Sequence, residues 1–226
     1  MNKISKTIFF AFVVVFIGIA IVVSDAYSWD DGDNQYWNTE SASWKLGDNW
    51  KASIEEEFRF GDNSSNFYYQ HSDLGIVWSG LAEWINLGLN YRHIFEEKNS
   101  KWRVENRPHL NATVKWKLFD IDFSNRGRLE IRNREKAEDF LRYRNKFTIK
   151  SPFKLTKFKI QPYVADEIFY DFDQETLNKN RFYAGIVFKI FDNLKGDVFY
   201  LLERSENSSN KWYDYNVLGT KLKFVF

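Results

Sequence analysis

Residues 103–118 read RVENRPHLNATVKWKL, and this stretch decides the fold class. Apolar side chains recur at every second position except Asn106, at Val104, Pro108, Leu110, Ala112, Val114, Trp116 and Leu118, while the positions between them are polar or charged. A period of two is the side-chain period of a β-strand and not of a helix. The stretch is longer than the five or six residues of an ordinary strand, whereas a strand tilted across a bilayer needs about 9 to 11. We therefore interpret residues 103–118 as a membrane-spanning strand.

The same alternation recurs along the chain, clearly at 50–60, 121–134 and 218–226. The expected strands are 34–45, 49–60, 67–79, 84–95, 102–118, 121–134, 140–150, 157–170, 181–191, 195–205 and 213–226. This pattern predicts an all-β, up-and-down antiparallel transmembrane β-barrel of about 10–12 strands. Because single-chain bacterial barrels have an even number of strands, we expect ten or twelve. Segment 34–45 is then either an arm outside a ten-stranded wall or part of a wall of twelve.

The connections are expected to alternate in length. Short turns are predicted near residues 47–48, 80–81, 120, 151–152 and 192–193, and longer polar loops at 61–66, 97–100, 135–138, 171–180 and 205–210. Short periplasmic turns and longer outer loops are typical of outer-membrane barrels.

The N-terminus predicts export. A basic region, Met1 to Lys6, precedes an apolar run from Ile8 to Val23 and a small-residue stretch that ends at Ala26. Residues 1–26 are therefore predicted to be a signal peptide, with an uncleaved anchor as the alternative. Residues 27–226 are expected to form one barrel domain, since no linker divides them and no apolar run there approaches 18 residues.

The composition excludes several classes of protein. Aromatic residues make up 19% of the chain and charged residues 28%, a combination that favours the barrel. The absence of cysteine excludes a disulfide scaffold, a thiolate metal site and a lipid-modified cysteine. A net charge of +1 argues against a nucleic-acid partner.

The C-terminal strand carries the most specific local signal. Its alternating apolar residues, ending in Phe224 and Phe226, resemble the signal by which outer-membrane barrels are recognised for assembly. This resemblance implies the barrel assembly machinery and outer-membrane lipid as partners.

The body of the chain is similar to a family of small porin-superfamily barrels catalogued as a domain of unknown function. The resemblance covers nearly the whole mature chain and rests on residues 35–37, 88–92, 162–167, 181–185 and 218–226. It implies the barrel fold and a place in the outer membrane of a Gram-negative bacterium. It implies no catalytic residue and no cofactor.

One set of charged residues is a candidate site in the lumen. The inward phase of two consecutive strands predicts a basic stripe of Arg126, Arg128, Arg132, Arg134, Arg142, Arg144 and Lys146. Acidic partners expected on the inner wall are Glu55, Glu57, Glu105, Asp122, Glu130 and Glu167. Such a stripe favours anions in an open pore, or it pairs with these carboxylates and fills a narrow interior. Glu167 has the chemistry of a general acid, but we expect it to neutralise a wall arginine.

The sequence offers little for catalysis. A nucleophile and its base must approach to about 2.6–3.2 Å, but His71 and the adjacent Ser72 point to opposite faces. His93 is expected on the lipid-facing side near the outer rim, and His109 completes the set of histidines. No GxSxG motif and no metal-spaced cluster is present. We therefore expect no enzymatic activity and no metal.

Three functions remain open at this point. The first is a small porin-like channel for small polar or anionic solutes. The second is a closed structural or binding barrel without conductance, and the third, less favoured, is a membrane-embedded lipid hydrolase. Tryptophans near the connections are expected to form interface girdles, at Trp44, Trp50, Trp78, Trp84, Trp116 and Trp212.

Overall fold

The computed structural model describes residues 31–98, 100–136, 138–153, 155–207 and 209–226. The strands are β1 (Asp33–Lys45), β2 (Trp50–Gly61), β3 (Asn66–Ala82), β4 (Ile85–Lys98), β5 (Lys101–Leu118), β6 (Ile121–Arg134), β7 (Phe140–Lys150), β8 (Gln161–Asp171), β9 (Thr176–Phe191), β10 (Leu194–Glu206) and β11 (Trp212–Val225). The all-β prediction is confirmed. The predicted signal peptide, residues 1–26, lies outside the described residues. Within the described ranges, no helix has the length and apolar character needed to cross a membrane.

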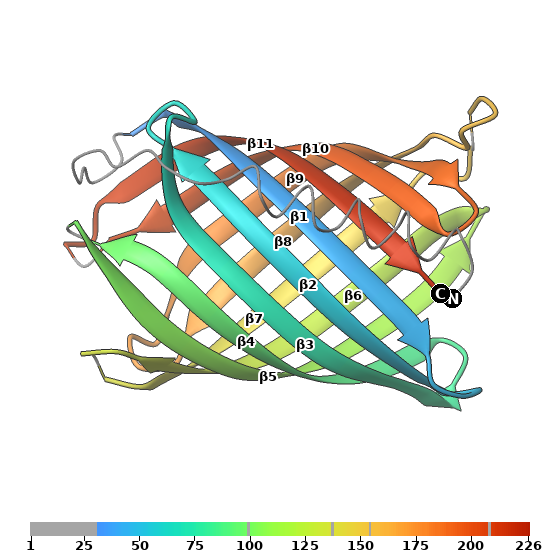
Figure 1. The fold of residues 1–226 in the computed structure, drawn as a ribbon, viewed down its shortest axis with the longest axis horizontal. Coiled ribbons are helices and arrows are strands. Elements are labelled where there is room, and N and C mark those ends of the chain that lie inside the picture. The colour runs from blue at the N-terminus through green and yellow to red at the C-terminus, as the bar shows by residue number, and fades with distance from the viewer. Residues whose placement is uncertain (1–30, 99, 137, 154, 208) are drawn as a thin grey trace, which may run out of the picture.

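The eleven strands close into a barrel in sequence order (Figure 1). Strands that follow each other in the chain pair antiparallel, whereas β1 pairs with β11 in parallel. This parallel seam follows from the odd strand number, because the first and last strands then run in the same direction. The expectation of ten or twelve strands was wrong. Residues 34–45 are no arm: β1 is hydrogen-bonded along both edges, so it leaves no unpaired edge in the wall.

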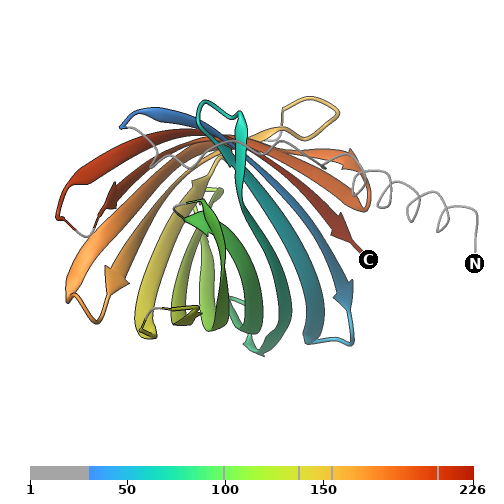
Figure 2. The ribbon, with the colours of Figure 1, turned by 60° about the vertical axis from the view of Figure 1, so that its left-hand side comes forward.

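The connections gather at two ends of the barrel (Figures 1 and 2). We call the end with connections 46–49, 83–84, 119–120, 151–160 and 192–193 the turn end; Phe226 also lies there. The opposite end, with connections 62–65, 99–100, 135–139, 172–175 and 207–211, is the loop end.

Two predicted connections differ from the structure. The short turn expected at 151–152 is a ten-residue connection, and β8 begins at Gln161 instead of residue 157. Here Leu155 and Ile160 form a separate β-bridge, and Lys189 N donates a hydrogen bond to Phe158 O at 2.7 Å. The strand-like alternation of residues 157–160 thus belongs to a small hairpin outside the wall.

The long loop expected at 171–180 is also wrong, because β9 begins at Thr176. Its polar sequence is typical of a loop, but neighbouring strands of the wall provide hydrogen-bond partners for these side chains. Lys179 points inward and donates to Glu203 at 2.5 Å, while Asn180 donates to Asp166 on the neighbouring strand at 2.9 Å.

Alternate residues of each strand face the lumen and the outside. On β5, Glu105, Arg107 and His109 are buried inside the barrel, whereas Leu110 and Trp116 are 56% and 42% exposed on its outer surface. A soluble protein would place these groups the other way round. An apolar outer wall around a polar interior is the arrangement of outer-membrane barrels.

Aromatic side chains lie at both ends of the outer wall. Trp44, Trp50, Trp78, Trp84 and Trp116 stand at or near the turn end, and Trp212 begins β11 at the loop end. Some stack on neighbouring rings: the ring centroids of Trp116 and Phe123 are 5.6 Å apart with an interplanar angle of 7°. Amphipathic rings at the two ends are typical of interface girdles.

Deletion of Phe226 is expected to slow barrel insertion and to reduce the heat-modifiable folded band on gels. Phe226 N donates to Ser43 O at 2.9 Å, its carbonyl accepts from Lys45 N at 3.2 Å, and its ring stacks on Trp44. The residue therefore completes the β1–β11 seam, which must close before the wall is stable in lipid. Phe226→Ala keeps the backbone bonds and should show a smaller defect. Folding of the truncated chain in cells at the wild-type level would contradict this role.

Candidate functional site

The lumen has two halves of different character. Toward the loop end, inward side chains are packed against each other, so that Glu130 is 0% and Phe169 is 1% exposed. Toward the turn end, inward side chains border a cavity of about 550 Å³. The interior is thus filled at one end and hollow at the other.

The centre of the filled half is an arginine–glutamate network. Glu130 accepts hydrogen bonds from Arg142 Nη2 at 2.6 Å and from Arg144 Nη1 at 2.9 Å. Arg144 Nη2 also donates to Glu167 Oε1 at 2.9 Å, and Arg126 reaches the same oxygen at 2.9 Å. Burial of such charges is tolerated only when each is paired and hydrogen-bonded. The network therefore links β6, β7 and β8 on the inside of the barrel.

Further ion pairs extend this packing around the lumen. Glu105 accepts from Arg107 Nε at 2.8 Å and from Arg132 Nε at 2.6 Å. On the opposite wall, Glu203 accepts from Arg181 Nε at 2.5 Å. These ion pairs connect β5 with β6 and β9 with β10, so they hold the loop-end half on two opposite parts of the wall.

Apolar and aromatic side chains complete the filling. Trp37 on β1, Leu201 on β10 and Val217 on β11 form a buried cluster on neighbouring strands inside the barrel. The guanidinium of Arg59 lies 3.7 Å from the ring centroid of Trp37, and it also pairs with Glu57. Cations stacked on rings in this way are stabilised by the ring quadrupole.

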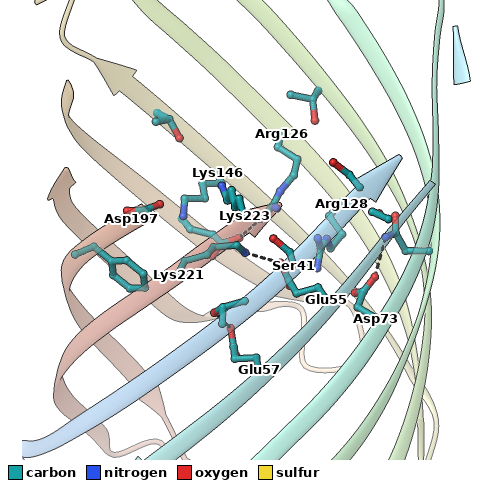
Figure 3. Close-up of a pocket in the computed structure, with 18 of the residues that line it drawn as sticks. Ser41, Glu55, Glu57, Asp73, Arg126, Arg128, Lys146, Asp197, Lys221 and Lys223 are labelled. Carbon is teal, nitrogen blue, oxygen red and sulfur yellow. Dashed lines mark hydrogen bonds and ion pairs between the residues drawn. The ribbon is translucent and has the colours of Figure 1, made fainter. Parts of the chain in front are cut away.

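The cavity in the other half is basic. Its lining contains ten lysines and arginines but five aspartates and glutamates, an excess of five positive charges. Figure 3 shows Lys146, Lys221 and Lys223 pointing into this space beside Arg126. A concave site lined by one sign of charge concentrates ions of the other sign. We call it the lumenal cavity.

Three lysines of the lumenal cavity lack an acidic partner. Among the described residues, no carboxylate oxygen lies within 4.0 Å of the ammonium groups of Lys51, Lys146 or Lys223, whereas Lys221 pairs with Glu55. Lys146 instead lies 3.3 Å from the ring centroid of Tyr183. These groups can donate hydrogen bonds to an anion without first breaking an ion pair.

The structure divides the predicted basic stripe between the two halves. Arg132 and Arg142 lie in the filled half, and Arg126 and Lys146 border the lumenal cavity. Arg128 and Arg144 lie at the boundary, because both are buried near Glu130 and also border the cavity. Arg134, the last residue of β6, keeps the inward phase at the loop-end rim, where its guanidinium lies 4.5 Å from the ring centroid of Phe140 and donates to Glu138 O at 2.9 Å.

The predicted acidic partners behave differently from one another. Glu105, Glu130 and Glu167 pair with stripe arginines. Glu55 pairs with Lys221 on β11, and Glu57 pairs with Arg59 on its own strand, β2. Asp122 keeps the inward phase of β6 but lies at the turn-end rim, where Lys117 Nζ is 3.4 Å away. Its place as the second residue of β6 puts it beyond reach of the arginines.

The three histidines do not meet. His71 is fully buried in the lumen beside Tyr69, with Glu55 3.5 Å away, and His109 lies 3.6 Å from Asp73. His93 is on the outer wall, where Nδ1 lies 2.7 Å from Asn106 Oδ1. Within the described ranges, no cluster of three or more histidines and carboxylates could hold a metal ion.

Sequence reasoning missed part of the site. Lys51, Lys221 and Lys223 occupy polar positions in the alternation of residues 50–60 and 218–226, but nothing in the sequence connects them with the stripe on β6 and β7. The closed barrel brings β11 and β2 to face β7 across the lumen. Strand phase alone could have assigned these lysines inward, whereas their convergence needed the closure.

Comparison with known proteins agrees with this architecture. Among solved structures, LpxR from Salmonella typhimurium is similar, with a TM-score of 0.50 and 10% identity over 82% of this chain and 87% of that chain. At this identity the likeness shows the fold alone, a barrel of outer-membrane type. No curated protein matches the chain. A family model described as "Protein of unknown function (DUF2490)" matches residues 34–214, from β1 into β11. Because this match spans most of the chain and reaches from β1 into β11, the protein belongs to the DUF2490 family.

Proposed function

We propose that the protein is an outer-membrane barrel that binds a small polyanion in its lumenal cavity and does not conduct ions. The ligand class is a phosphorylated or polycarboxylate solute that enters from the turn end. The proposal includes no catalytic step. An outer-membrane location, with the turn end toward the periplasm, is part of it.

The observation that carries the proposal is the uneven filling of the lumen. The excess of five positive charges, with three lysines free of carboxylate partners, supports an anionic ligand. A volume of about 550 Å³ is in the range of small-molecule sites. The buried ion pairs of the loop-end half support a closed barrel, because a water path there would require them to separate.

Binding of inorganic pyrophosphate and of citrate tests the ligand class. With the full chain folded in detergent micelles, titration calorimetry should detect binding that weakens as salt rises, since screening shortens the range of the charges. Lys146→Met and Lys223→Met should each weaken binding about 10- to 150-fold, because a hydrogen bond to a charged group contributes about 1.5–3 kcal/mol. Lys211→Met, at the loop end, is the matched control and should have no effect.

Planar-bilayer recordings test the closed lumen. We expect no stable conductance steps from the wild-type barrel. A stable, anion-selective conductance would overturn the closed-barrel proposal in favour of the porin-like channel. Equal binding by the wild type and by Lys146→Met would remove the lumenal cavity as the anion site.

A further inference from the structure

The outer wall carries polar side chains where an outer-membrane barrel is normally apolar. Glu40, Glu56, Ser72, His93 and Asn106 are successive register partners on β1 to β5. They point outward because the residues on either side of each one face the lumen. We call this set the outer polar row.

Two carboxylates in the outer polar row oppose each other. Glu40 and Glu56 are direct cross-strand partners, an arrangement in which like charges destabilise a sheet. Among the described residues, no lysine, arginine or histidine nitrogen lies within 4.0 Å of either carboxylate, and Ser72 hydrogen-bonds to Glu56. Its Oε2 atom is buried and has no hydrogen-bond partner among the described residues. The pair therefore lacks a cation.

At the other end of the outer polar row, hydrogen bonds around Asn106 orient His93 so that its ring can accept a hydrogen bond. Asn106 Oδ1 lies 2.7 Å from Tyr91 Oη and 2.7 Å from His93 Nδ1. Both groups therefore donate to this oxygen, which leaves Nε2 of the neutral imidazole as an acceptor. The row thus offers imidazole and carboxylate acceptors and no cationic donor.

An apolar groove lies on the same wall, on the turn-end side of the row. It has a volume of about 660 Å³ and is lined by Ile76, Trp78, Leu87, Leu89, Ala112 and Gly127, among others. The small residues Ala112 and Gly127 are register partners and lie beside the larger side chains of β3 and β4. We call it the outer groove.

We propose that the outer groove and the outer polar row together bind one lipid with an ammonium-bearing headgroup. Leu89 is four residues from His93 along β4, about 13 Å at the rise of a strand. An acyl chain can therefore occupy the groove while its headgroup lies at the row. The ammonium then supplies the cation that Glu40 and Glu56 lack. This site is independent of the lumenal cavity, since it lies on the other face of the wall.

Lipid retention measured by native mass spectrometry tests the proposal. The full chain, folded in detergent micelles, is exposed to phosphatidylethanolamine or to phosphatidylglycerol with the same acyl chains. The wild type should retain one phosphatidylethanolamine about three- to fivefold better, the factor expected from one charge pair at a membrane surface. Glu56→Gln should abolish this preference.

A second pair of variants tests the groove. Ala112→Phe fills it and should abolish retention of both lipids, whereas Ala184→Phe makes the same change on the exposed outer face of β9 and should not. Heat-modifiable gel mobility verifies folding, and Ala112→Leu replaces the phenylalanine variant if that variant does not fold.

Three outcomes would contradict the proposal. Unchanged lipid retention by Ala112→Phe or Ala112→Leu would show that the outer groove is not the acyl-chain site. Equal retention of the two lipids by the wild type would overturn the headgroup assignment. If Ala112→Phe instead converts a dimer to a monomer with lipid retention unchanged, the groove belongs to a second copy of the chain, and the proposal fails.

Discussion

Replacement of Glu130 by glutamine is expected to lower the free energy of unfolding by about 3–5 kcal/mol, because it leaves buried arginines without their counter-charge. Glu130 is fully buried and accepts from Arg142 and Arg144. Arg107 and Arg128 lie at 3.9 and 3.6 Å from its oxygens. Glutamine preserves the shape and removes only the charge. Denaturant titration in lipid vesicles, followed by tryptophan fluorescence, measures the change.

Two further variants make this prediction specific. Glu83→Gln, in an exposed turn between β3 and β4, should change stability by no more than about 0.5 kcal/mol. Adding Arg142→Gln to Glu130→Gln should recover part of the loss, because it removes one of the unpaired charges. A loss below about 1 kcal/mol for Glu130→Gln would mean that the network is hydrated, since that is the range of solvent-exposed ion pairs.

Ala112→Arg is expected to destabilise the barrel by about 2–4 kcal/mol in lipid vesicles, the cost of a guanidinium on the lipid face near mid-depth. Ala112 is exposed on the outer wall among leucines and tryptophans. Its neighbour Thr113 faces the lumenal cavity. Thr113→Arg places the same group in water beside its register partner Arg126, so like-charge repulsion is its main cost and should be about 1 kcal/mol or less.

The comparison of these neighbours tests the face assignment directly. Asn111, the other inward neighbour, is a poorer control because its side-chain oxygen accepts from Arg128 Nε at 2.7 Å. Equal losses for Ala112→Arg and Thr113→Arg would show that the two faces meet the same solvent, and the transmembrane interpretation would then fail.

Local pattern was sufficient for most strand bounds. Segments 121–134 and 140–150 were predicted with the bounds that β6 and β7 have. The prediction of strand bounds was poorest at 151–160 and at 171–180, because the structure of these residues depends on contacts with strands that are distant in the sequence. The first forms a small hairpin against β9, and the second lengthens β9 through contacts with β8 and β10.

The sequence by itself determined the all-β class, the strand bounds and the inward phase of the charged residues. It could do so because a strand in a barrel wall has one outward apolar face and one inward polar face. Apolar and polar side chains therefore alternate with a period of two along each segment. The tertiary structure alone decided the odd strand number, the parallel β1–β11 seam, the filled and hollow halves of the lumen, and the alignment of Glu40, Glu56, Ser72 and His93 outside. These features depend on which residues of different strands become register partners. Register is set when the whole wall closes, and no single segment carries that information.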